Sequence, residues 1–166
     1  MYKLRNYKFL IFVLILTLGI FLRIWKLSEY PIHLSHDEIT QLYDAISIAQ
    51  TGADVYGNFL PTIFPSVGDY KSPFYTYATV FIYYIFGNHE WIIRIPGVVF
   101  GILIIPAIFY FTSKLTKNSN VALFASFFTA ISPAEIFFSR KSFENGAGIF
   151  FLLISLSCFL TFLEKK

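Results

Sequence analysis

Hydrophobic and polar positions are arranged along this chain in long blocks. Apolar blocks run over about 9–27, 92–113, 121–138 and 146–163, each near the roughly 20 residues that an α-helix needs to cross a membrane. The stretch between the first two blocks, 28–91, is mostly polar. The pattern predicts an all-α membrane protein, a multi-span transmembrane helix bundle with a long first outer loop.

One further apolar run, 74–86, is about 13 residues long, too short to cross a bilayer, and it carries several tyrosines. These features are typical of a juxtamembrane helix lying at the interface. Counting it as a span would place Lys114 and Lys117 outside the cell, whereas four spans place them in the cytoplasm, together with the N-terminus. We therefore prefer four spans, and five are the alternative.

The first apolar block follows Lys3, Arg5 and Lys8, a basic lead that also suits a cleaved signal peptide. The block ends at Arg23 and Lys26 without the small residues of a cleavage site. We expect an uncleaved signal anchor, and hence a multi-pass integral protein of the cell or plasma membrane in contact with membrane lipids.

The composition narrows the class of protein further. With 56% hydrophobic, 20% aromatic and only 14% charged residues, the chain does not fit an ordinary soluble domain. The sequence contains no basic patch of the kind that binds nucleic acid, so we expect no nucleic-acid partner. The single cysteine, Cys158, rules out a disulfide or thiolate metal framework. Without a P-loop or a dinucleotide fingerprint, we expect no nucleotide cofactor.

Polar chemistry concentrates at the start of the outer loop, in Ser35-His36-Asp37-Glu38. Ser35 and Glu38 have the spacing of a capping box, and Gly52 offers a stop for the helix that would follow. Asp37, in the first turn, should be ionised and able to accept a proton or hold a metal. We therefore predict Asp37 and Glu38 as catalytic residues, although Glu38 alone fits a capping role and Asp37 a helix-dipole role.

Several short motifs together resemble those of a known family. They are Tyr30-Pro31, Asp37-Glu38, Lys71-Ser72-Pro73, Phe86-Gly87 and Arg94-Ile95-Pro96. The set is similar to the polyprenyl- or dolichyl-phosphate-sugar-dependent membrane glycosyltransferases of GT-C fold, in particular the protein O-mannosyltransferases and aminoarabinose transferases. Ser72 stands where the family usually has a proline, and Glu144 where it more often has Asp.

The resemblance implies a function and a set of site residues. A membrane glycosyltransferase of this kind would move a sugar, with inversion, from a polyprenyl- or dolichyl-phosphate carrier to a protein, lipid or glycan acceptor. Lys71, Arg94 and Arg140 would bind the donor phosphate. Asp37 and Glu144 would hold a divalent metal cation. The alternatives are a snorkelling Lys71, an Arg94 that braces the loop, and a Glu144 that caps the next helix.

Enzymes of this family contain many more spans than 166 residues can supply. We therefore expect this chain to be the N-terminal part of such an enzyme, inactive alone. A rival interpretation is a non-catalytic membrane component or a lipid-carrier transporter subunit. A transporter would place charges at mid-membrane on broken helices, whereas the charges here gather at one face.

Overall fold

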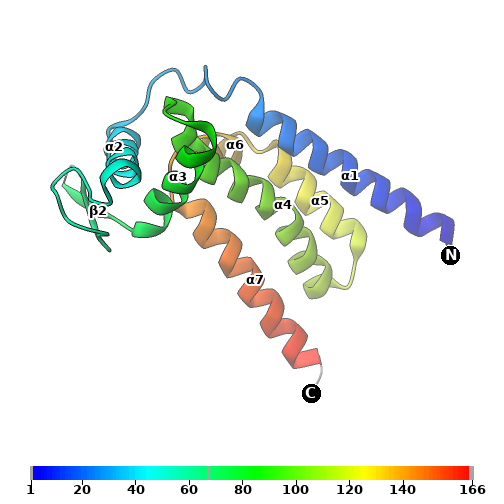
Figure 1. The fold of residues 1–166 in the computed structure, drawn as a ribbon. Helices are drawn as coiled ribbons and strands as arrows, with labels where there is room; N and C mark the ends of the chain where they lie inside the picture. Colours follow the sequence, from blue (N-terminus) through cyan, green and yellow to red (C-terminus); the bar gives the residue numbers. More distant parts are fainter. Residues whose placement is uncertain (1, 67, 165–166) are drawn as a thin grey trace. The chain divides into compact units, whose positions relative to one another are not determined.

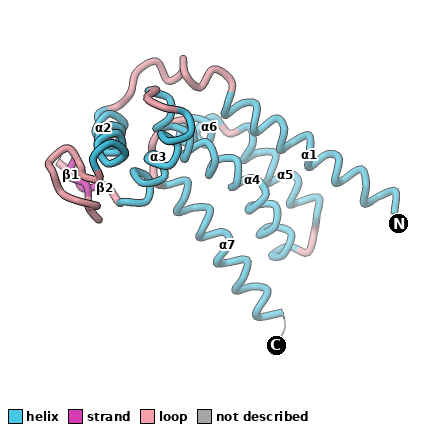
Figure 2. The backbone as a smooth tube through the Cα atoms, viewed as in Figure 1, coloured by secondary structure: helices cyan, strands magenta, loops and turns pink. Residues whose placement is uncertain are grey.

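The structure is a computed structural model that describes residues 2–66 and 68–164, and its elements are mostly helical (Figures 1 and 2). The prediction of an all-α membrane protein is confirmed. The helices are α1 (Tyr2–Ile24), α2 (His36–Thr51), α3 (Pro73–Phe86), the 3₁₀ helix η1 (Glu90–Arg94), α4 (Ile95–Thr116), α5 (Ser119–Ile131), α6 (Pro133–Ser139) and α7 (Asn145–Glu164). Two short antiparallel strands, β1 (Phe64–Ser66) and β2 (Asp69–Lys71), form a hairpin.

The chain divides into two compact units, each of which is described by itself. The membrane unit consists of 1–25, 99–139 and 145–166, and the loop unit of 26–98 and 140–144. The loop unit contains α2, the hairpin, α3 and η1, and it therefore contains most of the residues predicted to form a site.

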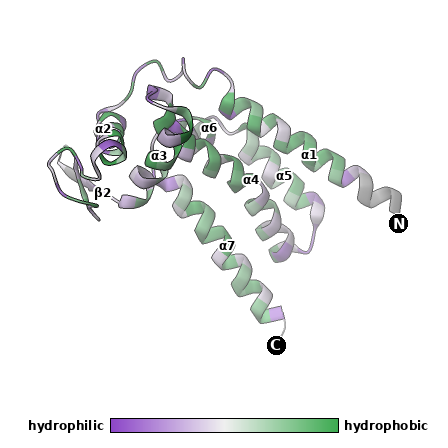
Figure 3. Cartoon of the chain, viewed as in Figure 1, coloured by the Kyte–Doolittle hydropathy of each residue, from purple (hydrophilic) through white to green (hydrophobic). Residues whose placement is uncertain are grey.

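Within the described residues, three helical stretches are long and apolar enough to cross a membrane: Tyr7–Ile24, Glu90–Thr116 and Asn145–Glu164. Hydrophobic residues dominate these helices (Figure 3). A fourth candidate is a bent pair, since the segment expected as one helix over 121–138 is α5 and α6, which meet at an angle of 59°. At 14 residues, α3 is shorter than a span.

The break between α5 and α6 has a visible cause in the sequence. Pro133 has no N–H to give to the carbonyl of Thr129, four residues earlier. In the membrane unit, where α1 packs on α5, the fully buried Arg23 donates from Nη2 to the Thr129 oxygen (3.1 Å) and from Nη1 to the Ala130 oxygen (3.1 Å). A side chain of α1 thus satisfies the carbonyls at the break.

Replacing Arg23 by Met should lower the unfolding temperature in detergent. The change leaves the buried carbonyl of Ala130 and the partly buried carbonyl of Thr129 without these donors, at a cost of up to about 1–3 kcal/mol each. Arg23→Lys, which keeps the charge but lacks the guanidinium fork, should lie between Arg23→Met and the wild type. An Arg23→Met protein that unfolds at the wild-type temperature would show that the break does not depend on this side chain.

The loop unit is built around α2. Its N-terminus has the predicted capping box, in which Ser35 and Glu38 exchange hydrogen bonds, and Gly52 ends it in the left-handed conformation (φ 79°). The buried face of α2 is unusually polar, while Ile39 (37% exposed) and Tyr43 (63%) point outward. The residues on the buried face are Glu38, Gln41, Leu42, Asp44, Ala45 and Ile48.

The β1–β2 hairpin lies between α2 and α3. Phe64 pairs with Lys71 and Ser66 with Asp69, and the Phe64 side chain is buried. Pro73 then occupies the first turn of α3, where a residue without an N–H is well tolerated. The hairpin therefore fixes the place of Lys71 just before α3 begins.

Candidate functional site

Asp37 and Lys71, both predicted as site residues, lie against one another in the loop unit. The Lys71 Nζ atom is 3.3 Å from the Asp37 Oδ1 atom, and the Ser66 hydroxyl donates to the same oxygen (3.3 Å). The Asp37 side chain is 37% exposed and that of Lys71 17%. A solvent-accessible carboxylate and a cation thus lie side by side. The β1–β2 hairpin, which carries Ser66 and Lys71 to Asp37, was not expected from the sequence.

Glu38 lies next to Asp37 in the chain but in different surroundings. It is 1% exposed, and its Oε2 atom accepts from the Ser35 N–H (2.8 Å) and the Ser35 hydroxyl (3.0 Å). Its Oε1 atom is 3.5 Å from Arg94 Nε. These contacts support the capping alternative, and nothing in this geometry supports direct contact between Glu38 and a substrate.

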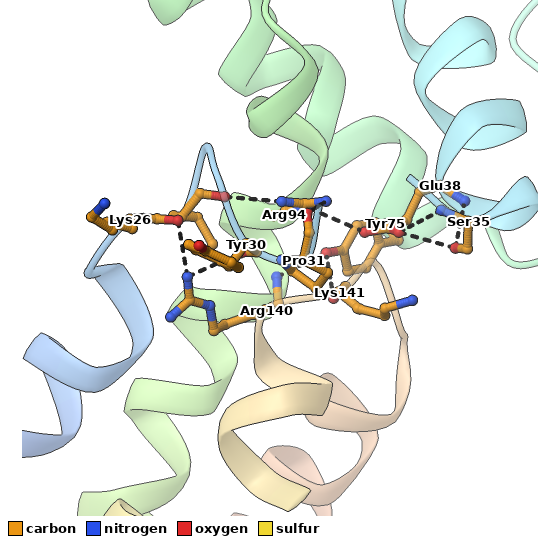
Figure 4. A network of polar contacts seen from close by, with 11 residues as sticks. Lys26, Tyr30, Pro31, Ser35, Glu38, Tyr75, Arg94, Arg140 and Lys141 are labelled. Carbon is orange, nitrogen blue, oxygen red and sulfur yellow. Dashed lines mark hydrogen bonds and ion pairs between the residues drawn. The ribbon is translucent and has the colours of Figure 1, made fainter. Parts of the chain in front are cut away.

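Arg94 is 3% exposed and braces the chain between α1 and α2. Besides facing Glu38, it donates from Nη1 to the Leu27 oxygen (2.9 Å) and from Nη2 to the Pro31 oxygen (2.8 Å) (Figure 4). This arrangement matches the bracing alternative considered for Arg94. Both of its Nη atoms are engaged with the backbone, so phosphate binding by Arg94 stays a prediction.

Arg140, in the 140–144 loop, contacts the same segment between α1 and α2, the turn formed by residues 26–31. Its Nη2 atom donates to the oxygens of Lys26 (3.0 Å) and Tyr30 (2.9 Å) (Figure 4). Burial lowers the pKa of Arg140, and the positive charge of Arg94 acts in the same direction. Two arginines thus fasten the 26–31 turn, and phosphate binding by Arg140 likewise stays a prediction.

Glu144, at the other end of the 140–144 loop, contacts the start of α3. Its Oε1 atom accepts from the N–H of Ser72, the N-cap residue of α3 (3.0 Å). Asp37 and Glu144 therefore reach consecutive residues, Lys71 and Ser72. The structure brings both predicted carboxylates to the N-terminal end of α3.

The donor set at this place is poor for a metal. Among the residues that the structure describes, no three His, Cys, Asp or Glu side chains gather as potential ligands. Asp37 faces Lys71, and the carboxylate of Glu144 accepts a backbone hydrogen bond. The residues present do not fit a bound divalent cation.

Tyr75 is a residue of this site that sequence reasoning missed, because it lies inside the apolar 74–86 run. It is 1% exposed; its hydroxyl accepts from the Gly97 N–H (2.9 Å) and donates to the Lys141 oxygen (3.4 Å) (Figure 4). Burial raises the pKa of Tyr75 above its usual range, the Gly97 N–H opposes this, and the charges of Glu38, Arg94 and Glu144 also act on the group. The phenol is therefore protonated and can donate and accept together.

The comparison with protein families identifies the class of protein. Residues 70–166, more than half of the chain, match the family described as dolichyl-phosphate-mannose-protein mannosyltransferase. No curated protein and no solved structure matches the chain. The match covers Lys71, Arg94, Arg140 and Glu144, and the apolar helices agree with an integral membrane protein. The chain belongs to the dolichyl-phosphate-mannose-protein mannosyltransferase family of membrane glycosyltransferases.

Proposed function

We propose that this protein transfers a sugar from a polyprenyl- or dolichyl-phosphate carrier to an acceptor hydroxyl at the outer face of the membrane, with inversion at the anomeric carbon. The observation that carries the proposal is the pair formed by Asp37 and Lys71, whose charged atoms are 3.3 Å apart. A base for the acceptor and a cation for the leaving phosphate are the two groups that such a transfer needs.

In the transfer step, the acceptor oxygen attacks the anomeric carbon from the side opposite the phosphate. The acceptor O–H proton moves to the Asp37 carboxylate, and the bond between the anomeric carbon and the phosphate oxygen breaks. Its electron pair stays on the lipid phosphate, whose negative charge increases. Asp37 serves as general base, a role worth about 10²–10⁴-fold in rate.

Lys71 is the residue that we assign to the leaving phosphate. In the structure its ammonium faces Asp37. A donor phosphate would compete for this ammonium, and the flexible lysine side chain can move from the carboxylate to the phosphate oxygens. The exchange would place positive charge where negative charge develops and would free Asp37 to accept a proton.

Other residues around Asp37 hold the local backbone in place and support the transfer step indirectly. Glu38 caps α2 and faces Arg94, while Arg94 and Arg140 hold the backbone of the 26–31 turn. Glu38 and Arg94 are both buried and hydrogen-bonded, and such groups fix the first turn of α2 in place. Asp37 is therefore presented on a rigid support.

The orientation of the chain is part of the proposal. With the N-terminus in the cytoplasm, four spans put the loop unit outside and Lys114 and Lys117 inside, in agreement with the positive-inside rule. The 14-residue α3 would then lie at the membrane surface. The acceptor would be a protein, lipid or glycan outside the plasma membrane.

Replacing Lys71 by Ala in the full-length protein should raise the apparent KM for the lipid-linked donor by about tenfold or more, since a charge-assisted contact is worth roughly 1.5–3 kcal/mol. Stability should change little, because this ion pair is partly open to solvent, and solvent-accessible ion pairs contribute at most about 1 kcal/mol. The measurement is transfer rate against donor concentration in detergent, with unfolding temperature in parallel. Lys71→Arg, which keeps the charge, should retain most of the donor affinity. An unchanged KM for Lys71→Ala would refute the phosphate assignment.

A further inference from the structure

We propose that Tyr75 is a positioning residue for the transfer reaction. Its hydroxyl fastens the 140–144 loop to α3 and so determines where Glu144 stands relative to Lys71 and Asp37. The inference rests on the proposed function, and it adds a residue that the motifs of the sequence do not point to.

The Tyr75 hydroxyl joins three separate parts of the loop unit. It belongs to the first turn of α3, accepts from the Gly97 N–H near the start of α4, and donates to the Lys141 carbonyl in the 140–144 loop. The group therefore uses both its donor and its acceptor capacity on backbone atoms. A backbone partner fixes the path of the loop whatever side chain stands at position 141.

The same loop is fastened to α3 a second time. Three residues before Tyr75, the Ser72 N–H donates to the Glu144 carboxylate. The preceding residue, Lys71, faces Asp37. Tyr75 and Ser72 thus both contact the 140–144 loop, and Lys71, the neighbour of Ser72 in the chain, contacts Asp37. A shift of the loop would therefore reach the Asp37–Lys71 pair through the start of α3.

Packing alone does not account for a tyrosine at this position. The ring lies in a core with Leu42, Ile92 and Ile93, which a phenylalanine ring would fill equally well. A buried hydroxyl costs free energy unless it is hydrogen-bonded. The hydroxyl is retained where its two bonds order the Lys141 carbonyl and the first turn of α4.

The test is Tyr75→Phe in the full-length protein, with transfer measured per folded molecule. A displacement of about 1 Å at a reacting group can cost as much as 10²-fold in rate, so kcat should fall by about tenfold while the donor KM changes less than twofold. Tyr77→Phe is the matched control, because its hydroxyl lies on the same helix and donates to the Pro61 carbonyl (2.9 Å) instead. Its kcat should stay at the wild-type value.

A merely structural tyrosine would behave differently in a double-mutant cycle. If Tyr75 acts through the loop, Tyr75→Phe should lower kcat much less in a Glu144→Gln background than in the wild type. Additive effects of the two changes, or a wild-type kcat per folded Tyr75→Phe molecule, would overturn the proposal.

Two further arms keep the test decisive. If Tyr75→Phe does not fold, p-aminophenylalanine at position 75 replaces it. Its amine can donate to the Lys141 carbonyl, so kcat per folded molecule should be retained. A lost kcat would overturn the proposal.

If the wild-type protein transfers no sugar from the lipid-linked donor, the proposed function fails. Hydrogen exchange of 140–144 then decides the positioning role: faster exchange in Tyr75→Phe than in Tyr77→Phe supports it, and equal exchange refutes it.

Discussion

Replacing Asp37 by Asn is expected to lower sugar transfer by about 10²-fold or more, the usual scale for the loss of general-base help. Asn keeps the shape of the side chain and can still accept from the Ser66 hydroxyl, but it cannot take up the acceptor proton. The measurement is the single-turnover rate of the full-length protein at saturating lipid-linked donor. The donor KM should change less than the rate, because the lost interaction belongs to the transition state.

A matched control lies on the same helix. Asp44 is buried; burial raises its pKa, the Val55 N–H lowers it, and the nearby Asp54 carboxylate raises it. Asp44→Asn removes a buried charge and can still accept from Val55, so it should leave the transfer rate near wild type. Near-wild-type transfer by Asp37→Asn would return Asp37 to a helix-dipole role.

Replacing Arg94 by Met is expected to produce the largest loss of stability in the loop unit. The change leaves Glu38 buried without its charged partner and removes the donors to Leu27 and Pro31. Breaking a buried ion pair in this way costs about 3–5 kcal/mol in free energy of unfolding. The yield of folded protein and its unfolding temperature in detergent should both fall.

Two companion variants separate charge from shape at Arg94. Arg94→Lys keeps a positive charge but loses the planar fork that reaches two carbonyls, so it should recover only part of the stability. Adding Glu38→Gln to Arg94→Met removes the unpaired charge while Gln can still complete the capping box, and it should restore part of the lost free energy. An Arg94→Met protein as stable as wild type would refute the bracing role.

Local signals in the sequence predicted the helices of the loop unit well. The capping box at Ser35 and Glu38 and the stop at Gly52 both depend on hydrogen bonds or backbone angles within a few residues. Such features need no knowledge of the tertiary fold, and each of them is confirmed.

Features that depend on contacts distant in sequence were missed. The bend between α5 and α6 has a local signal in Pro133, but its support by Arg23 joins residues more than 100 positions apart. The β1–β2 hairpin is too short for a period-two pattern to show. Hydropathy alone would also bury Ile39 and expose Glu38, whereas the structure exposes Ile39 and buries Glu38. The burial of Glu38 is possible because Arg94 compensates its charge.

In the candidate site, too, the residues could be predicted from local motifs but their contacts could not. The motifs named Asp37, Lys71, Arg94, Arg140 and Glu144, and the structure places all five in the loop unit. The sequence could not show which partner each of these side chains has. In the structure Asp37 contacts Lys71, whereas the guanidinium groups of Arg94 and Arg140 donate to backbone carbonyls. Tyr75 gave no signal, because an interfacial tyrosine and a buried positioning tyrosine look alike in a sequence.

The stereochemistry of the product tests the central claim most directly. Full-length protein in proteoliposomes would be given a polyprenyl-phosphate sugar labelled with ¹³C at the anomeric carbon, and the new glycosidic bond would be assigned by NMR. The account predicts a product with inverted anomeric configuration whose formation is lost in Asp37→Asn. A product with retained configuration, or equal transfer by wild type and Asp37→Asn, would contradict direct attack assisted by Asp37.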